Sequence, residues 1–236
     1  MAAPDALPVV TLDGRSLTPP AVVAIARGRA EARLGPPARE RNAAAERLVH
    51  GLLERGDLLY GVTTGVGALR SSPAAREDPG EHQWRLLRSH AGGGGAPLTV
   101  EVVRAAMAVR ANQIGAGGAG VGERLVDGLL GALREGVTPF ARELGSLGTG
   151  DLTVLAEIAV ALGGEGACWV GDDVQPAGEA LAARQQLPDE PLGGGVALAR
   201  LGGQPCLGAA AGDRHHLCGR ERPAVERDHG RHRDGG

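Results

Sequence analysis

Apolar side chains recur every three to four residues in the middle of this chain, a spacing that predicts amphipathic helices. Two stretches show it most clearly, 99–114 and 122–135, with stripes formed by Val100, Val103, Met107 and Ile114 in the first and by Leu125, Leu129 and Leu133 in the second. A third stretch, 151–163, is apolar on nearly every side, which is typical of a buried helix. We expect these three helices to pack together.

Shorter signals precede them. Residues 9–17 predict a short strand or a hairpin around Asp13-Gly14. Thr18 can cap a helix that starts with two prolines, and the apolar face of that helix continues to Ala30. Further helices are expected over 38–56, ending near Gly56, and over 81–95, ending at glycines. The predicted fold class is therefore mainly α, with small β elements near the N-terminus.

The pattern changes after about residue 185. The remaining residues show no sustained period, and the last of them are Arg, His, Asp and Gly with few apolar side chains. Such a segment buries too little surface to offset the entropy of ordering it, which predicts disorder from about residue 212. We divide the chain into a domain, 1–185, and an irregular or disordered tail, 186–236. A frameshifted gene end would produce the same abrupt change.

Composition narrows the functional classes. Only 2% of residues are aromatic, so the core must come from Leu, Val, Ile and Ala, which suits closely packed helices. The net charge of −3 is spread over interspersed acids and bases, which does not favour a nucleic-acid partner. The start lacks a signal-peptide pattern, and no apolar run is long enough for a membrane span. The three cysteines, Cys168, Cys206 and Cys218, show no paired spacing, which indicates free thiols in a reducing compartment. Together these observations predict a cytoplasmic protein.

Two motifs have a competing structural interpretation. Residues 115–120, "GAGGAG", match a dinucleotide fingerprint, but a helical pattern precedes them where that fingerprint needs a strand. A loop between helices is favoured. Several side chains near the end could bind zinc but lack paired spacing, so a solvated basic tail is favoured; they are His215, His216, Cys218, His229 and His232. We therefore predict neither a nucleotide nor a metal.

Tyr60 and the pair Ser89-His90 are candidate functional residues. Tyr60 is the single tyrosine of the chain and begins the glycine-spaced stretch "YGVTTGVG". A phenol on a mobile loop can act as a general base once its pKa is lowered, although a buried structural tyrosine explains the residue equally well. For Ser89 and His90, a capping serine and a half-exposed histidine are the favoured interpretation by themselves.

Five segments together resemble the aromatic amino acid ammonia-lyase family, which includes histidine ammonia-lyase. In order they are "LDGRSLT", "YGVTTGVG", "LLRSHAGGGGAPL", "VVRAAMAVRAN" and "GVTPFARELGSLGTGDLTVLAEIAVALGGEG". The similarity covers about residues 9–185. It implies the N-terminal part of the fumarase/aspartase-like (histidase-type) helical fold, including the start of its central bundle.

The resemblance also implies a chemistry. These enzymes eliminate ammonia from an aromatic L-amino acid and leave the α,β-unsaturated acid, using a methylidene-imidazolone group formed autocatalytically from an Ala-Ser-Gly tripeptide. By resemblance, Tyr60 is the catalytic base and Gly67 lies in the loop beside that group. Ser89 and His90 contact the substrate side chain, which favours histidine as the substrate. The family assembles homotetramers, and the amino acid substrate is the only other partner implied.

The tripeptide itself departs from the family pattern G-S-x-G-A-S-G-D-L. Aligned from Asp151, the place of Ala-Ser-Gly is taken by Gly148-Thr149-Gly150, in a loop one residue shorter. Threonine has a hydroxyl that can be eliminated, but its extra methyl would hinder an incoming amine. Asp151 is expected to cap the following helix, whose positive end would strengthen an electron acceptor there. The sequence leaves open whether the ring closes.

Family members are roughly twice as long, and their other catalytic groups lie beyond the similar region. Three functions therefore stay in competition. The chain is an ammonia-lyase, or an inactive fragment that only associates with homologous subunits, or an aminomutase or lyase with a non-standard prosthetic site. Without the rest of the bundle, the apolar faces of 151–163 should be partly bare.

Overall fold

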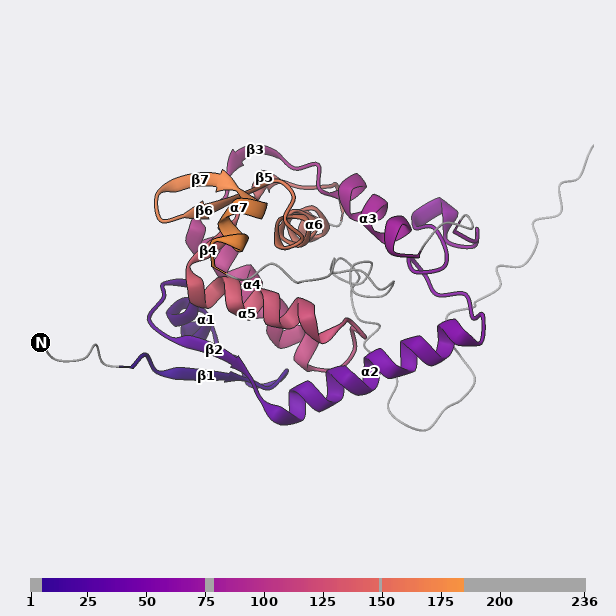
Figure 1. Ribbon diagram of the computed structural model, residues 1–236, viewed down its shortest axis with the longest axis horizontal. Coiled ribbons are helices and arrows are strands. Elements are labelled where there is room, and N and C mark those ends of the chain that lie inside the picture. Colours follow the sequence, from indigo (N-terminus) through magenta and orange to yellow (C-terminus); the bar gives the residue numbers. More distant parts are fainter. Residues whose placement is uncertain (1–5, 75–78, 149, 185–236) are drawn as a thin grey trace, which may run out of the picture. The chain divides into compact units, whose positions relative to one another are not determined.

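The computed structural model describes residues 6–74, 79–148 and 150–184 of the chain. Helices dominate this part (Figure 1). The α-helices are α1 (Pro19–Ala26), α2 (Pro36–Glu54), α3 (Pro79–His90), α4 (Val100–Gly115), α5 (Glu123–Glu135), α6 (Gly150–Leu162) and α7 (Ala177–Ala182), and η1 (Gly67–Leu69) is a 3-10 turn. The strands are β1 (Val9–Leu12), β2 (Glu31–Leu34), β3 (Gly94–Pro97), β4 (Val137–Pro139), β5 (Arg142–Leu144), β6 (Ala167–Val170) and β7 (Asp173–Pro176).

The core is built around α4, which packs against α1, α2 and α5. Its inner face is fully buried and meets the buried leucines of α5 and Ile158 of α6 in one apolar cluster. Thr99 begins α4, accepting a 3.4 Å hydrogen bond from the Val102 amide, and Gly136 ends α5 in the left-handed conformation. The mainly helical fold is confirmed, and the three central helices lie within one residue of their predicted positions.

Helix α6 is largely but not completely buried. Ala156, Ile158 and Ala159 are buried, whereas Leu152 and Leu155 remain partly accessible. The apolar surface of α6 is therefore partly accessible within the described residues, as the sequence analysis predicts.

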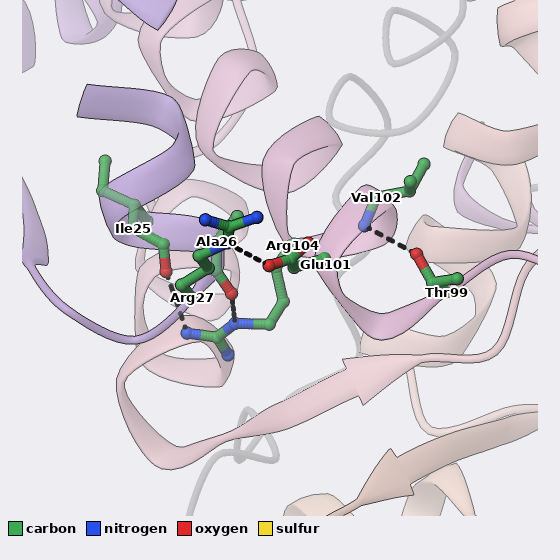
Figure 2. Close-up of polar contacts among 7 residues, drawn as sticks. All are labelled: Ile25, Ala26, Arg27, Thr99, Glu101, Val102 and Arg104. Carbon is green, nitrogen blue, oxygen red and sulfur yellow. Dashed lines mark hydrogen bonds and ion pairs between the residues drawn. The ribbon is translucent and has the colours of Figure 1, made fainter. Parts of the chain in front are cut away.

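A buried arginine joins α1 to α4 (Figure 2). The Arg104 guanidinium donates hydrogen bonds to Ala26 O at 2.8 Å and to Ile25 O at 3.3 Å. These carbonyls lie at the end of α1, where helical carbonyls lack intrahelical partners and a positive charge is favourable. Burial lowers the pKa of Arg104 from its ordinary value, but an arginine stays charged in a protein. Beside it, Arg27 and Glu101 form an exposed ion pair.

Of the two alternatives predicted for residues 9–17, the short strand is confirmed as β1, and the hairpin around Asp13-Gly14 is wrong. β1 pairs in parallel with β2, and α1 is the connection between them. The Asp13 carboxylate accepts hydrogen bonds from the amides of Arg15 and Ser16 and from the Ser16 hydroxyl, which lower its pKa to about 2. The Gly14 amide donates to Asn112 Oδ1 at 2.9 Å. The chain therefore turns onto the end of α4 instead of folding back on β1, and the helix expected to reach Ala30 ends at Ala26.

Strands are not confined to the N-terminus, which corrects a second prediction. β3 pairs with β5, and β4, β6 and β7 form an antiparallel sheet. These strands have only three or four residues, too few to show a clear alternation. Phe140 stacks on Trp169 beside this sheet with ring centroids 5.7 Å apart. Gly171, at φ 63°, lies in the turn between β6 and β7, a hairpin that the sequence analysis did not predict.

Several predictions concern residues outside the described ranges. They are the disorder of the tail from about residue 212, the boundary between 1–185 and 186–236, and the histidine and cysteine cluster near the end. The segment 115–120 is described, and it ends α4 and leads to α5. Its interpretation as a loop between helices is confirmed. None of the helices in the described ranges combines the length and the apolar character needed to cross a membrane.

Candidate active site

Tyr60 and Gly67 lie in the segment between α2 and α3, and the structure brings them together. The Tyr60 side chain is 60% exposed, and its phenolic oxygen accepts a 3.2 Å hydrogen bond from the Gly67 amide. Gly67 has φ 59°, a conformation that glycine adopts without strain. Because the oxygen is the acceptor in this bond, the phenolic proton is free to point elsewhere.

Threonines and a small apolar cluster hold this segment. Thr63 Oγ1 accepts a 2.8 Å hydrogen bond from the Leu59 amide. Val62 is buried against Val49 of α2. His82 of α3 lies 3.3 Å from the Thr64 carbonyl through Nε2, and since a carbonyl only accepts, that nitrogen carries the proton. The Tyr60 segment is thus attached to both α2 and α3, while its mobility stays a prediction.

Ser89 and His90 end α3. His90 Nδ1 lies 2.7 Å from the Leu86 carbonyl, so Nδ1 is protonated and donates. Ser89 Oγ donates to the same carbonyl at 2.7 Å and lies 3.1 Å from His90 Nδ1. These bonds fix the imidazole plane. In the neutral ring they leave Nε2 as a hydrogen-bond acceptor on a partly exposed side chain.

The loop before α6 closes on itself. A Cβ on Gly145 would lie 2.3 Å from the Gly150 carbonyl oxygen, so only glycine fits there. The Ser146 amide donates to Thr153 Oγ1 at 3.1 Å. Gly148 has φ 87°, and among the described residues no atom from elsewhere in the chain lies within 4 Å of where a Cβ on Gly148 or Gly150 would be. Thr149, the middle residue of the predicted tripeptide, lies outside the described residues.

Two charged side chains interact at the start of α6: Asp151 of α6 itself and Arg110 of α4. The helix begins at Gly150, one residue earlier than predicted, so Asp151 lies in its first turn and Thr149 precedes the helix. A carboxylate in the first turn is still favoured by the positive end of the helix. Arg110 of α4 is 6% exposed; burial lowers its pKa, and the negative charge of Asp151 opposes that shift. The sequence analysis missed this buried guanidinium because its neighbour is 41 residues away.

The three parts of the site meet through their supporting helices. His82 ties the Tyr60 segment to α3, and α3 packs along α6 (Figure 1). The contact is close, since a Cβ on Gly163 would lie 2.0 Å from the Trp84 ring. Among the described residues, no hydrogen bond joins Tyr60 or His90 directly to Gly148, Gly150 or Asp151. No cluster of three potential metal ligands occurs in the described ranges either.

Two anchoring residues were also missed. His82 gave no sequence signal because its partner is a backbone carbonyl. Glu157 did give one: it is the only charged residue within the apolar stretch 152–162. A carboxylate in such a helix needs hydrogen-bond donors from another element, because burying it without them is costly.

Comparisons with known proteins show which family the chain is similar to. Residues 17–211 match the family model described as aromatic amino acid lyase. The chain is 41% identical over 197 residues to a histidine ammonia-lyase of Anaeromyxobacter dehalogenans, an alignment that covers 83% of this chain and 37% of that protein.

Solved structures show the same fold. Histidine ammonia-lyase from Trypanosoma cruzi superposes with a TM-score of 0.72 at 28% identity, over 82% of this chain and 37% of that one. Tyrosine aminomutase from Streptomyces globisporus gives a TM-score of 0.72 at 32% identity, over 78% and 34%. The chain thus spans little more than a third of the length of these relatives. It belongs to the aromatic amino acid lyase family.

Proposed function

We propose that this chain is part of an ammonia-lyase that eliminates ammonia from an aromatic L-amino acid, with histidine as the foremost substrate, to give the α,β-unsaturated acid. The observation that carries the proposal is the similarity to histidine ammonia-lyases along most of the chain, at 41% identity for the relative from Anaeromyxobacter. The described geometry supports it, because Tyr60, His90 and the loop before α6 lie on neighbouring elements.

The loop before α6 fits a prosthetic group made from Gly148, Thr149 and Gly150. Ring closure needs the Gly150 nitrogen to approach the Gly148 carbonyl. The first amides of a helix have no intrahelical acceptor, and open space surrounds both glycines at the Cβ position. A methylidene-imidazolone-type group at this place would supply an electrophile for the substrate amine.

Three further roles fall to groups of this chain. Tyr60 removes the β-proton, with its oxygen held by the Gly67 amide at 3.2 Å. Ser89 and His90 contact the substrate side chain, His90 through Nε2 while its Nδ1 donates to the Leu86 carbonyl. The positive end of α6, with Asp151 in its first turn, favours negative charge that develops beside it.

Mass and turnover measurements test the proposal together. The chain produced in its native host should lose two water molecules within the peptide that contains Thr149, and should release ammonia from histidine faster than from tyrosine or phenylalanine. Thr149→Ala should abolish both signals, because alanine has no hydroxyl to eliminate. Tyr60→Phe should keep the mass loss and reduce turnover at least about a hundredfold, the usual contribution of a general base.

An unmodified mass together with no ammonia release would overturn the proposal. The chain would then be an inactive partner of longer homologous subunits. Co-expression with such a subunit, followed by affinity capture of one chain, tests for that association.

A second candidate function is an aminomutase. The similarity to tyrosine aminomutase, at 32% identity and a TM-score of 0.72, specifically favours it. Both activities need the same base and electrophile, and they differ in whether the released ammonia adds back to the β-carbon. Product analysis distinguishes them: a β-amino acid identifies the mutase, and the unsaturated acid with free ammonia identifies the lyase.

A further inference from the structure

We propose that Glu157 of α6 is a positioning residue that holds the segment after His90 and the strand before the tripeptide loop in one arrangement. This inference rests on the proposed function, which assigns roles to His90 and Gly148. It concerns a side chain that touches neither the substrate nor the reacting atoms.

One carboxylate accepts hydrogen bonds from two backbone amides that are far apart in sequence. Glu157 Oε1 accepts from the Gly93 amide at 3.0 Å, and Oε2 accepts from the Arg142 amide at 2.9 Å. Hydrogen bonds to an ionised carboxylate are about twice as strong as neutral ones. They offset the cost of a charge within the apolar stretch 152–162 of α6.

The contact at Gly93 leaves no room for a side chain. A Cβ on Gly93 would lie 2.5 Å from Glu157 Oε1, so the backbone rests directly on the carboxylate. Loss of the carboxylate would leave both amides without these acceptors.

The two amides belong to segments that lead to the candidate site. Gly93 follows His90 by three residues and precedes β3. Arg142 begins β5, which ends directly before the loop that carries Gly148. Since Glu157 itself lies on the helix that starts at Gly150, a single side chain connects α6, the segment after His90 and the strand before the loop that carries Gly148.

If Glu157 only stabilised the fold, replacing it would affect stability alone. A positioning role predicts more, because displacements of about 1 Å at a reacting centre can reduce rates a hundredfold. If Gly93 or Arg142 moves, His90 and Gly148 move relative to each other. Formation of the ring and contact with the substrate should then both suffer in a protein that remains folded.

The test compares Glu157→Gln with Glu135→Gln in the full chain. Glutamine preserves the volume of residue 157 but retains only one acceptor oxygen, so one of the two amides, Gly93 or Arg142, should exchange hydrogen about tenfold faster. The fraction of chains that lose two water molecules should fall several-fold. In preparations that turn over histidine, kcat/KM should fall at least about tenfold. Glu135 pairs with Arg134 on the surface, and its variant should change none of these values.

A second variant approaches the contact from the other side. Gly93→Ala should push the carboxylate away and reproduce the loss of ring formation. Because Gly93→Ala and Glu157→Gln break the same contact, the double variant should lose little more ring formation than either single variant. This arm keeps the proposal testable should Glu157→Gln fail to fold.

Unchanged amide exchange at both Gly93 and Arg142 in a folded Glu157→Gln protein would show that Glu157 does not hold these two segments, and it would overturn the proposal. Faster exchange with an unchanged modified fraction and unchanged kcat/KM would overturn the positioning role. If the unaltered chain itself shows neither water loss nor turnover, the proposed function fails, and the amide exchange alone decides whether Glu157 holds the two segments together.

Discussion

At the scale of single residues, two glycines with similar backbone angles serve different purposes. Gly14 has φ 80°, and a Cβ there would lie 2.5 Å from the Ala116 nitrogen. Gly28 has φ 66°, with nothing within 4 Å of its Cβ position. Gly28 therefore only permits a turn, whereas Gly14 also permits close approach of two backbones.

Alanine substitution should separate these two effects. Gly28→Ala should lower the free energy of unfolding by about 1 kcal/mol, the cost of a left-handed alanine. Gly14→Ala should cost at least about 2 kcal/mol more, because backbone atoms of Ala116 must shift. Urea denaturation of both variants measures the difference. Equal losses would contradict the close approach at Gly14.

A buried cysteine gives a prediction for pH. Burial raises the pKa of the Cys168 thiol to about 12. Because the raised pKa favours the neutral thiol, the associated stability is present below the unfolded value near 8.5 and is lost as the pH rises toward 12. The nucleophile in alkylation is the thiolate. In the native chain at pH 8, the Cys168 peptide should therefore resist iodoacetamide, and it should react quickly in urea; rapid native labelling would disprove this.

At the scale of elements, the attachment of α1 to α4 depends on a charge at the end of a helix. Arg104 donates to two carbonyls of α1 from a position that is 8% exposed. The neighbouring Arg27–Glu101 pair is about half exposed. The two arginines at this helix junction thus differ in burial and in partner, so comparing them separates a buried helix cap from an exposed ion pair.

Replacing each with methionine keeps a side chain similar to the aliphatic part of arginine and removes the charged guanidinium. Arg104→Met should lower the free energy of unfolding by about 2–3 kcal/mol, because buried carbonyls lose a charged donor. Arg27→Met should cost less than about 1 kcal/mol, the usual value of an exposed ion pair. Amide exchange in α1 should rise only for Arg104→Met. The opposite order of stability would show that packing of α1, and not its capping, holds the junction.

At the scale of the whole molecule, apolar side chains remain on the surface beside the candidate site. Leu144 is 60% exposed, and Leu147 is fully exposed in the loop that carries Gly148. Exposed apolar groups of this size favour association. We propose that the chain forms homo-oligomers, in keeping with the tetramers that the family resemblance implies.

Sedimentation velocity over a hundredfold range of concentration measures this association. The average mass should rise with concentration, and Leu144→Ser combined with Leu147→Ser should reduce the rise, because less apolar surface is buried between chains. A mass that stays at one chain throughout the range would refute the prediction.

The central helices were predictable because their apolar stripes extend over three or four turns. A helical period of that length can be recognised even where single residues depart from it. β4, β6 and β7 were missed because each has only three or four residues and pairs with a strand elsewhere in the chain. The parallel pairing of β1 with β2 likewise depends on packing against α4 and α5, which local residues do not specify.

The candidate residues of the site followed from motifs, and the groups that hold them did not. Tyr60, Gly67, Ser89 and His90 lie within short segments whose order along the chain indicates the family. His82 and Glu157 form hydrogen bonds with backbone groups 18 and 64 residues away. Every residue has the same backbone groups, so the sequence does not show which of them a side chain will meet.

By itself the sequence determined where the long helices lie, which family the chain resembles and which residues are candidates for chemistry, because periodicity and motifs are local properties. Only the tertiary structure decided that Tyr60 meets Gly67, that Gly145 rests on Gly150, and that Glu157 joins two amides. Hydrogen bonds between distant segments require the fold to bring donor and acceptor within about 3 Å. That condition is set by the packing of the helices together and not by any one stretch of residues.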